Sequence, residues 1–381
     1  MRHSVEKYGR AEVESWWWEV WNEPDIGYWQ GTPEEYFKLY DYAAEGLKRA
    51  LPTARIGGPH VTGPTGARPQ KFLRDFLEHC LRGRNDATGK TGSPLDYVGF
   101  HAKGAPRVTD AGHVRMGISN HLTNIANGFA IVASYPEIKD VPIIIGESDP
   151  EGCAACPARA YPQNAYRNGT MYSSYTAEQI ARTYELARAH KVNLLGSVTW
   201  AFEFEGQPYF DGFRDLATNG IDKPVLNIFR MLGRMGGEFV SVDSSGALPL
   251  ESVRDVGVRQ EPDVSAIATR KERTVAVLVW NYHDDDVPAP AAEVDLVVEH
   301  VPIGPVTVDH HRVDAAHSNA YEAWKRMGAP RTPTADQYAQ LEKAGQLASI
   351  APPQRLEASG GRVRLAFTLP RQGVSLVTIA W

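Results

Sequence analysis

The stretch Trp16-Trp-Trp-Glu-Val-Trp-Asn-Glu-Pro24 has the composition of a β-strand that ends in an asparagine and a glutamate. Aromatic and β-branched residues favour strands, and the closing proline cannot donate a hydrogen bond to a neighbouring strand. Because successive side chains of a strand point to opposite faces, Glu23 is expected to share a face with Trp21 and Glu19. Asn22 and Glu23 then lie at the carboxyl end of the strand, where α/β barrels hold their catalytic groups.

Strands and helices alternate through the part of the chain that follows this stretch. Thr32 and Glu35 have the spacing of a capping box and predict the start of a helix. Further strands are expected over 54–58, 95–101, 141–145 and 194–202, and helices over 32–51, 69–81, 120–134, 177–190 and 224–232. Five strands that alternate with helices predict a parallel α/β architecture. No Gly-x-Gly-x-x-Gly follows a strand, which argues against a dinucleotide-binding fold.

The pattern changes beyond residue 237. Segments that alternate approximately apolar and polar residues are found at 264–269, 274–280, 294–299, 307–312, 362–368 and 375–379. Such short alternating strands between turns are typical of a β-sandwich. A helical insert is expected over about 314–348, with helices near 321–327 and 335–347. The sequence therefore predicts an α/β catalytic domain over 1–236 and an all-β domain over 237–381.

Composition narrows the functional classes. The 381 residues carry a formal net charge of −6, which argues against the basic surface of a nucleic-acid-binding protein. No run approaches 18 consecutive apolar residues, which excludes a membrane-spanning helix. Cys153 and Cys156 are best explained as part of a structural loop, with a local disulfide as an option. The 9 Trp, 16 Tyr and 12 Phe suit both a core and a sugar-binding cleft. The cellular compartment stays open.

A second carboxylate occupies an equivalent place. Glu147 follows the apolar run Val141–Gly146, at the end of another predicted strand. Glu23 and Glu147 are therefore expected to face the same cleft. Two such carboxylates are what glycoside hydrolysis requires, one to protonate the leaving oxygen and one to attack the sugar or to activate water.

The motifs, taken in order, resemble glycoside hydrolase family 39, the β-xylosidase family. The residues that carry this resemblance are Trp18–Pro24, Glu35–Asp41, Arg55–Pro59, Tyr97–His101, Ile144–Glu147, Thr199–Phe202, Asp222–Leu226 and, in the second half, His317–Tyr321, Trp324 and Met327–Pro330. The resemblance covers nearly the whole chain. It implies an α/β fold whose catalytic domain is a (β/α)8 TIM barrel, of which this chain has strands 4 to 8, followed by an all-β sandwich with a small helical insert.

The resemblance also implies roles for single residues. Glu23 would be the acid/base and Glu147 the retaining nucleophile. The implied substrate-binding residues are Asn22 at the sugar 2-hydroxyl or the nucleophile, His101 as the group that orients Glu147, Trp200 stacked on the sugar, and Glu203 or Glu205 at a sugar hydroxyl. The choice between Glu203 and Glu205 stays open. The chemistry calls for no metal and no organic cofactor.

The implied activity is that of a retaining exo-glycosidase, with a β-xylosidase that releases xylose from xylo-oligosaccharides as the first choice. The alternatives are the same machinery acting on an arabinoside, galactoside or glucoside, and a non-catalytic carbohydrate-binding protein with an incomplete barrel. Two departures from the family pattern, Gly146-Glu-Ser148 and His101-Ala-Lys103, leave the sugar open.

The first three barrel strands have no counterpart in this sequence. We expect an upstream segment or a partner chain to complete the barrel and to supply a partner for the inward-pointing Glu19, because apolar sheet edges are usually covered. A homo-oligomer also remains open.

Overall fold

The computed structural model describes all 381 residues, Met1–Trp381. By packing, the chain divides into two units that are each assembled from three segments. Unit 1 comprises Met1–Lys103, Asn120–Asp149 and Thr183–Thr199, and unit 2 comprises Gly104–Ser119, Pro150–Arg182 and Trp200–Trp381. The predicted domain boundary near residue 237 lies within unit 2 and stays a prediction. None of the helices combines the length and the apolarity needed to cross a membrane.

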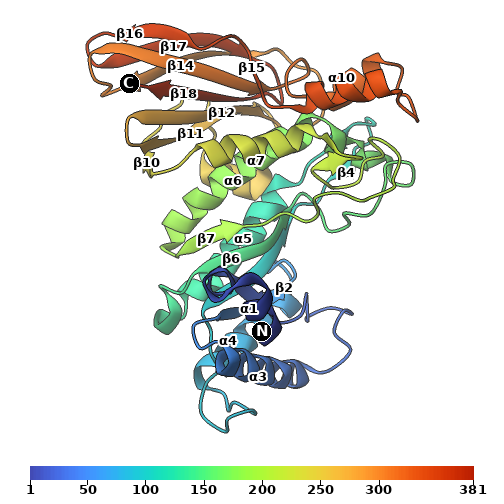
Figure 1. Cartoon of the computed structure of the whole chain (residues 1–381), viewed down its shortest axis with the longest axis vertical. Coiled ribbons are helices and arrows are strands. Elements are labelled where there is room, and N and C mark those ends of the chain that lie inside the picture. Colours follow the sequence, from blue (N-terminus) through green and yellow to red (C-terminus); the bar gives the residue numbers. More distant parts are fainter. The chain divides into compact units, whose positions relative to one another are not determined.

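Unit 1 is built on a curled parallel sheet that forms part of a barrel (Figure 1). Its strand order is β1-β2-β3-β6-β7. The strands are β1 (Trp17–Glu19), β2 (Arg55–Val61), β3 (Tyr97–Lys103), β6 (Ile143–Asp149) and β7 (Leu194–Ser197). Every neighbouring pair is parallel, which confirms the predicted α/β architecture. β1 and β7 are the edge strands, and the completion of the barrel by further strands stays a prediction.

Helices cover this sheet. They are α1 (Arg2–Tyr8), α2 (Arg10–Ser15), α3 (Pro33–Ala50) and α4 (Ala67–Arg82), with a 3-10 turn at Pro136–Ile138; α5 (Ile118–Ala133) and α6 (Thr170–His190) contribute residues to both units. The predicted capping box is confirmed, because the Thr32 side chain accepts from the Glu35 amide while the Glu35 carboxylate accepts from the Thr32 amide. Tyr36 and Phe37 on α3 pack against Phe72 and Phe76 on α4, so the two helices share one aromatic core.

Unit 2 contains the predicted β-sandwich. Its larger sheet has the order β10-β11-β12-β18-β14-β15, with β16 also paired to β14. The bounds are β10 (Glu238–Val240), β11 (Asp263–Lys271), β12 (Thr274–Tyr282), β14 (Gly304–Val313), β15 (Ala348–Ser349), β16 (Gln354–Ala358) and β18 (Val374–Ala380). The second layer is the pair β13 (Ala292–Glu299) and β17 (Arg362–Leu369). Leu296 and Phe367 of the pair pack on Val277 and Val279 of β12. The apolar side chains of the alternating strands therefore form the core between the two sheets.

The helical insert is also present. It consists of α9 (Ala320–Arg326) and α10 (Ala335–Gly345), which confirms both predicted helices. Ala323 and Leu341 of these helices pack with Phe210 and Ile221 in one apolar cluster. The remaining elements of unit 2 are α7 (Pro224–Arg234), α8 (Leu250–Val256), a 3-10 helix at Pro162–Asn168, and the short pairs β4 (Arg107–Val108) with β5 (Val114–Arg115) and β8 (Ala217–Thr218) with β9 (Ile221–Asp222).

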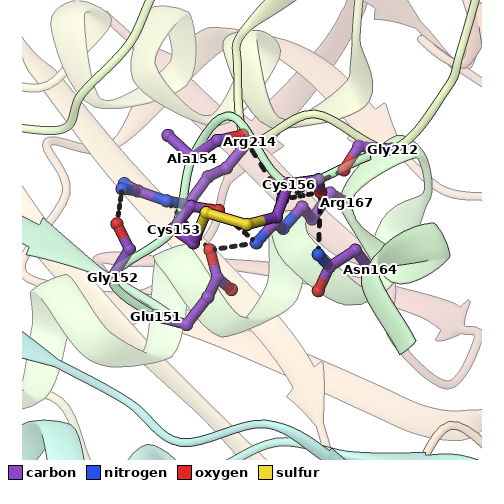
Figure 2. The surroundings of a disulfide bond; sticks show 9 residues. All are labelled: Glu151, Gly152, Cys153, Ala154, Cys156, Asn164, Arg167, Gly212 and Arg214. Atoms are coloured by element: carbon purple, nitrogen blue, oxygen red, sulfur yellow. Dashed lines mark hydrogen bonds and ion pairs between the residues drawn. A yellow bond between two sulfur atoms is a disulfide. The ribbon is translucent and has the colours of Figure 1, made fainter. Parts of the chain in front are cut away.

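The loop after β6 is closed by a disulfide between Cys153 and Cys156 (Figure 2). The buried guanidinium of Arg167 donates to the backbone carbonyls of Cys153 at 2.8 Å and Cys156 at 3.0 Å. Arg167 and Arg214 both contact one Glu151 oxygen, at 2.8 and 2.9 Å. Covalent and ionic links therefore hold the same short loop, in agreement with its structural interpretation.

Two predicted strands end earlier than expected. The strand expected over 194–202 ends at Ser197, and the early end of the other one affects the site. The strand expected to run from Trp16 towards Asn22 and Glu23 ends at Glu19, because the backbone turns into the left-handed region at Trp21, with φ 67°, and at Glu23, with φ 45°. Alternation along a strand therefore does not decide where Glu23 points. Strained backbone at such positions is common near functional groups.

Candidate active site

The segment that carries Glu23 is held in place by hydrogen bonds to neighbouring residues. The Glu23 amide donates to the carbonyl oxygen of His60 at 3.2 Å, so this segment continues beside the end of β2. The buried Asp25 carboxylate accepts from the Thr62 amide at 2.9 Å and from the Thr62 hydroxyl. The Tyr36 hydroxyl donates to the carbonyl oxygen of Val20 at 2.9 Å. These bonds fix Glu23 at the end of the sheet without a regular strand.

The structure brings together the two carboxylates that the sequence singled out. One carboxylate oxygen of Glu23, one of Glu147 and a ring nitrogen of His101 all lie within 4.8 Å of one another. Glu147 lies within β6, where it is in register with His101 on β3. The side chains of Glu23 and Glu147 are 13% and 20% exposed, so both carboxylates are mostly buried and reachable.

The partner of His101 differs from the expectation. His101 Nδ1 lies 2.9 Å from Glu23 Oε1, and His101 itself is buried. The close partner of Glu147 is instead Lys103, whose Nζ donates to Glu147 Oε2 at 2.6 Å. His101 therefore orients Glu23, and Lys103 places a positive charge against Glu147.

Two residues of this cluster were missed from the sequence. Lys103 Nζ also donates to Asp149 Oδ2 at 2.5 Å, and the buried Asp149 accepts from the Thr199 hydroxyl at 2.6 Å. Strand periodicity could have found both. Lys103 lies two residues after His101, Asp149 lies two residues after Glu147, and such residues share one face of a strand.

The side chain of a second histidine, His60 on β2, packs against β3 and β6. A Cβ atom added to Gly99 on β3 would lie 2.3 Å from His60 Nε2, and one added to Gly146 on β6 would lie 2.2 Å from His60 Nδ1. Two glycines on neighbouring strands therefore make room for this ring. His60 Nε2 lies 3.0 Å from the Tyr97 hydroxyl and 3.6 Å from Glu19 Oε2. Glu19 thus has a partner within the chain itself, which the sequence did not identify.

Burial sets the charge states of this inner pair. Burial lowers the pKa of His60 to about 3, and the neighbouring His101 contributes to the decrease. For Glu19 the loss of solvent raises the pKa to about 7; the charges of Glu147 and Glu23 add to the increase, and His101 opposes it. His60 is therefore neutral at pH 7, where Glu19 titrates.

We expect Gly146→Ala to destabilise unit 1. The added methyl would lie 2.2 Å from His60 Nδ1 and 3.2 Å from His101 Nε2, so two buried rings must shift. Overpacking of this kind costs about 1–3 kcal/mol in the free energy of unfolding, which urea denaturation measures. Gly196→Ala on β7 is the matched control, because its methyl would meet no atom within 4 Å. Equal stability of the two variants would contradict this account of His60.

The raised pKa of Glu19 predicts a pH-dependent stability. The unfolded carboxyl ionises near 4.5 and the folded one near 7, so between these values the folded chain binds more protons. The contribution of Glu19 to the free energy of unfolding therefore falls as pH rises through this window. Glu19→Gln removes this pH-dependent decrease. The free energy of unfolding of the variant, relative to wild type, should therefore be higher at pH 8 than at pH 5. Because the side chain is 37% exposed and water screens it, we expect a difference of about 1 kcal/mol in urea denaturation. An equal gain at both pH values would contradict the assignment.

The other predicted site residues are placed as follows. Asn22 is exposed and lines an open hollow of about 590 Å³ together with Glu19, Trp21 and Tyr28. Trp200, Glu203 and Glu205 belong to unit 2. Trp200 is 49% exposed, and the centroid of its ring lies 5.8 Å from that of the Phe204 ring. Glu203 accepts from the Gly220 amide at 2.9 Å, whereas Glu205 is exposed.

Comparison with known proteins identifies relatives over nearly the whole chain. The family model described as glycosyl hydrolases family 39 matches residues 1–361. The α-L-iduronidase of Mus musculus is 28% identical over 404 residues, which cover 99% of this chain and 60% of that protein. The β-xylosidase of Geobacillus stearothermophilus is 24% identical over 386 residues, which cover 99% of this chain and 68% of that protein. The chain thus spans about two thirds or less of these relatives.

A solved structure has the same fold. The monomeric β-xylosidase from Caulobacter crescentus CB15 superposes with a TM-score of 0.74 at 20% sequence identity, covering 99% of this chain and 72% of that chain. The partial barrel followed by a β-sandwich is therefore the architecture predicted from the sequence.

Proposed function

This chain belongs to glycosyl hydrolases family 39, and we propose that it is a retaining exo-glycoside hydrolase in which Glu23 is the acid/base and Glu147 the nucleophile. The proposal rests on one observation, the approach of a Glu23 and a Glu147 carboxylate oxygen to within 4.8 Å. Retaining enzymes hold their carboxyl groups about 5–5.5 Å apart, whereas inverting enzymes leave about 6.5–9.5 Å for a water molecule. The short separation favours retention.

In the first step, a Glu147 oxygen attacks the anomeric carbon. The bond from this carbon to the leaving oxygen breaks, its electron pair stays on that oxygen, and the oxygen takes the proton carried by Glu23. A glycosyl ester on Glu147 results. Lys103 steadies the attacking carboxylate through its 2.6 Å contact, and His101 orients Glu23.

In the second step, Glu23 takes a proton from water, whose oxygen attacks the anomeric carbon. The ester bond breaks, the carboxylate of Glu147 is restored, and the sugar leaves with its original anomeric configuration. His101 acts on Glu23 in both steps, because it is buried and lies 2.9 Å from that carboxylate.

The resemblance also names residues that would bind the sugar, in unit 1 and, separately, in unit 2. Asn22 lines the hollow beside Glu19 and offers an amide to a sugar hydroxyl. Trp200 presents a half-exposed ring for stacking. Of the two glutamates, the exposed Glu205 is free to contact a sugar, while Glu203 is engaged by the Gly220 amide.

A β-xyloside is our first choice of substrate, in line with the named β-xylosidase relatives. An α-L-iduronide is the second candidate, because one relative is an α-L-iduronidase and because Lys103 sets a cation beside the nucleophile. The two substrates are closely related. An α-L-iduronide has the ring configuration of a β-D-xyloside at C1 to C4 and adds a carboxylate at C5, which a lysine could attract.

The matched pair of 4-methylumbelliferyl β-D-xyloside and α-L-iduronide tests these candidates. We expect kcat/KM for the xyloside to exceed that for the iduronide at least tenfold, and proton NMR to show the β-anomer of xylose first. The reverse preference, with Lys103→Met weakening iduronide hydrolysis more than xyloside hydrolysis, would favour the uronide. Sugar binding without hydrolysis of any aryl glycoside would favour the carbohydrate-binding alternative.

A further inference from the structure

The lysine beside the proposed nucleophile has two anionic partners. Lys103 Nζ donates to Glu147 Oε2 at 2.6 Å and to Asp149 Oδ2 at 2.5 Å. The register of β3 and β6 explains both contacts, because Lys103 is paired with Asp149, and Glu147 lies two residues earlier on the same face of β6. One ammonium group therefore faces two carboxylates, of which the proposed reaction uses only Glu147.

The Asp149 carboxylate is fixed at both of its oxygens. Its side chain is fully buried, whereas that of Glu147 is 20% exposed. The Thr199 hydroxyl donates to Asp149 Oδ1 at 2.6 Å, while Oδ2 accepts from Lys103. Thr199, Asp149 and Lys103 all belong to unit 1, so this chain of contacts lies within one unit. A buried carboxylate that is hydrogen-bonded in this way has one defined position.

The backbone of Lys103 is fixed as well. Asn120 and Asn124 of α5 each donate a side-chain amide hydrogen to its carbonyl oxygen, at 2.7 and 3.1 Å. Asn124 Oδ1 in turn accepts from the Thr65 amide at 2.9 Å. The Lys103 side chain is only 16% exposed, so water solvates its ammonium group poorly. A lysine that is held and buried in this way depends on neighbouring carboxylates for its counter-charge.

The proposed reaction removes one of the two counter-charges. When Glu147 attacks the anomeric carbon, its carboxylate becomes a neutral ester, and Lys103 no longer faces a negative charge there. Asp149 does not react, so Lys103 keeps one carboxylate partner in the glycosyl-enzyme. Without the charge of Asp149, the same step would leave a mostly buried ammonium group unpaired, which is costly.

We propose that Asp149 is a positioning residue for the nucleophile and acts through Lys103, by supplying the counter-charge that Lys103 needs once Glu147 is esterified. The inference rests on the proposed function of Glu147 as the nucleophile. Two consequences distinguish this role from mere support of the fold. Loss of the Asp149 charge slows formation of the ester, and the size of that effect depends on the presence of Lys103.

The rate of ester formation measures this role directly. The full chain is mixed with dinitrophenyl 2-deoxy-2-fluoro-β-D-xyloside, or with the corresponding α-L-iduronide where that sugar is preferred, and intact-protein mass spectrometry follows the gain of one sugar. We expect Asp149→Asn to be labelled about a hundredfold more slowly than wild type, because the unpaired charge of Lys103 raises the barrier. Asp140→Asn makes the same chemical change at an exposed position of unit 1 and should be labelled at the wild-type rate.

A double variant separates the electrostatic role from a structural one. In Lys103→Met/Asp149→Asn no ammonium group remains to be left unpaired, so we expect labelling at least tenfold faster than in Asp149→Asn alone. If Asp149 only supported the fold, a second substitution in the same cluster would add to the damage instead. Circular dichroism verifies that each variant is folded. Should Asp149→Asn fail to fold, the double variant is compared with Lys103→Met, in whose background loss of the Asp149 charge should not slow labelling.

The outcomes distinguish this inference from the proposed function. Labelling of Asp149→Asn at a rate close to that of wild type would overturn the role of Asp149 and leave Glu147 as the nucleophile. A double variant that is labelled no faster than Asp149→Asn, or more than tenfold more slowly than Lys103→Met, would overturn it as well. Absence of any label on the wild-type chain would instead contradict the proposed function, and this inference with it.

Discussion

Replacement of Glu147 by glutamine is expected to lower kcat/KM for an aryl glycoside by about ten-thousand-fold, which corresponds to about 5 kcal/mol of lost transition-state stabilisation. The amide cannot form the glycosyl ester, and Lys103 loses the carboxylate it contacts at 2.6 Å. Steady-state kinetics on the purified chain measures the effect. Glu45→Gln on α3 of the same unit is a control that should leave kcat/KM unchanged.

A trapping experiment gives this prediction an independent readout. A 2-deoxy-2-fluoro glycoside with a good leaving group should esterify Glu147, because the fluorine slows hydrolysis of the ester. Peptide mass spectrometry then locates the added sugar. A label on any other carboxylate, or activity of Glu147→Gln within tenfold of wild type, would make the nucleophile assignment wrong.

Replacement of Glu23 by alanine should produce a loss that depends on the leaving group. General acid catalysis contributes a rate enhancement of about 10²–10⁴-fold, and protonation matters most for a poor leaving group. We therefore expect a loss of about 10⁴-fold on an unactivated disaccharide and a much smaller loss on a dinitrophenyl glycoside. Removal of the carboxylate also leaves His101 without the partner it has at 2.9 Å.

Sodium azide separates this role from a structural one. In Glu23→Ala the second step lacks a general base, and azide needs none to attack the glycosyl ester. Azide should therefore accelerate turnover of the dinitrophenyl glycoside and give the β-glycosyl azide. Uniform losses on all substrates, without azide rescue, would instead indicate that Glu23 only maintains the fold.

Local patterns in the sequence were sufficient to predict most of the helices and strands. The capping box at Thr32 and Glu35 located the start of α3, because its two hydrogen bonds involve residues only three apart. The apolar run before Glu147 located β6, although the strand extends further, to Asp149. Continuous apolar runs of this length identify strands buried on both faces.

The site was predicted less completely, and for a physical reason. The structure brings Glu23 next to Glu147, as expected, but the alternation argument behind that expectation is invalid because the strand ends at Glu19 and the backbone at Trp21 is left-handed. The catalytic role of Glu23 stays a prediction. His60 could not have been found, because its place depends on Gly99 of β3 and Gly146 of β6, which are both adjacent to its ring in the folded sheet. That adjacency comes from strand register, which single segments do not encode.

The division of the chain has a consequence for its synthesis. The polypeptide passes between the two units at residues 103, 119, 149, 182 and 199, so neither unit is one continuous stretch. On the ribosome, the sheet of unit 1 cannot gain β7 until residue 197 has emerged, by which time two segments of unit 2 are already exposed and await the β-strands that follow. Contacts between distant segments form slowly and leave apolar surface uncovered meanwhile. We therefore expect early segments of unit 2 to stay unprotected until the later strands have emerged.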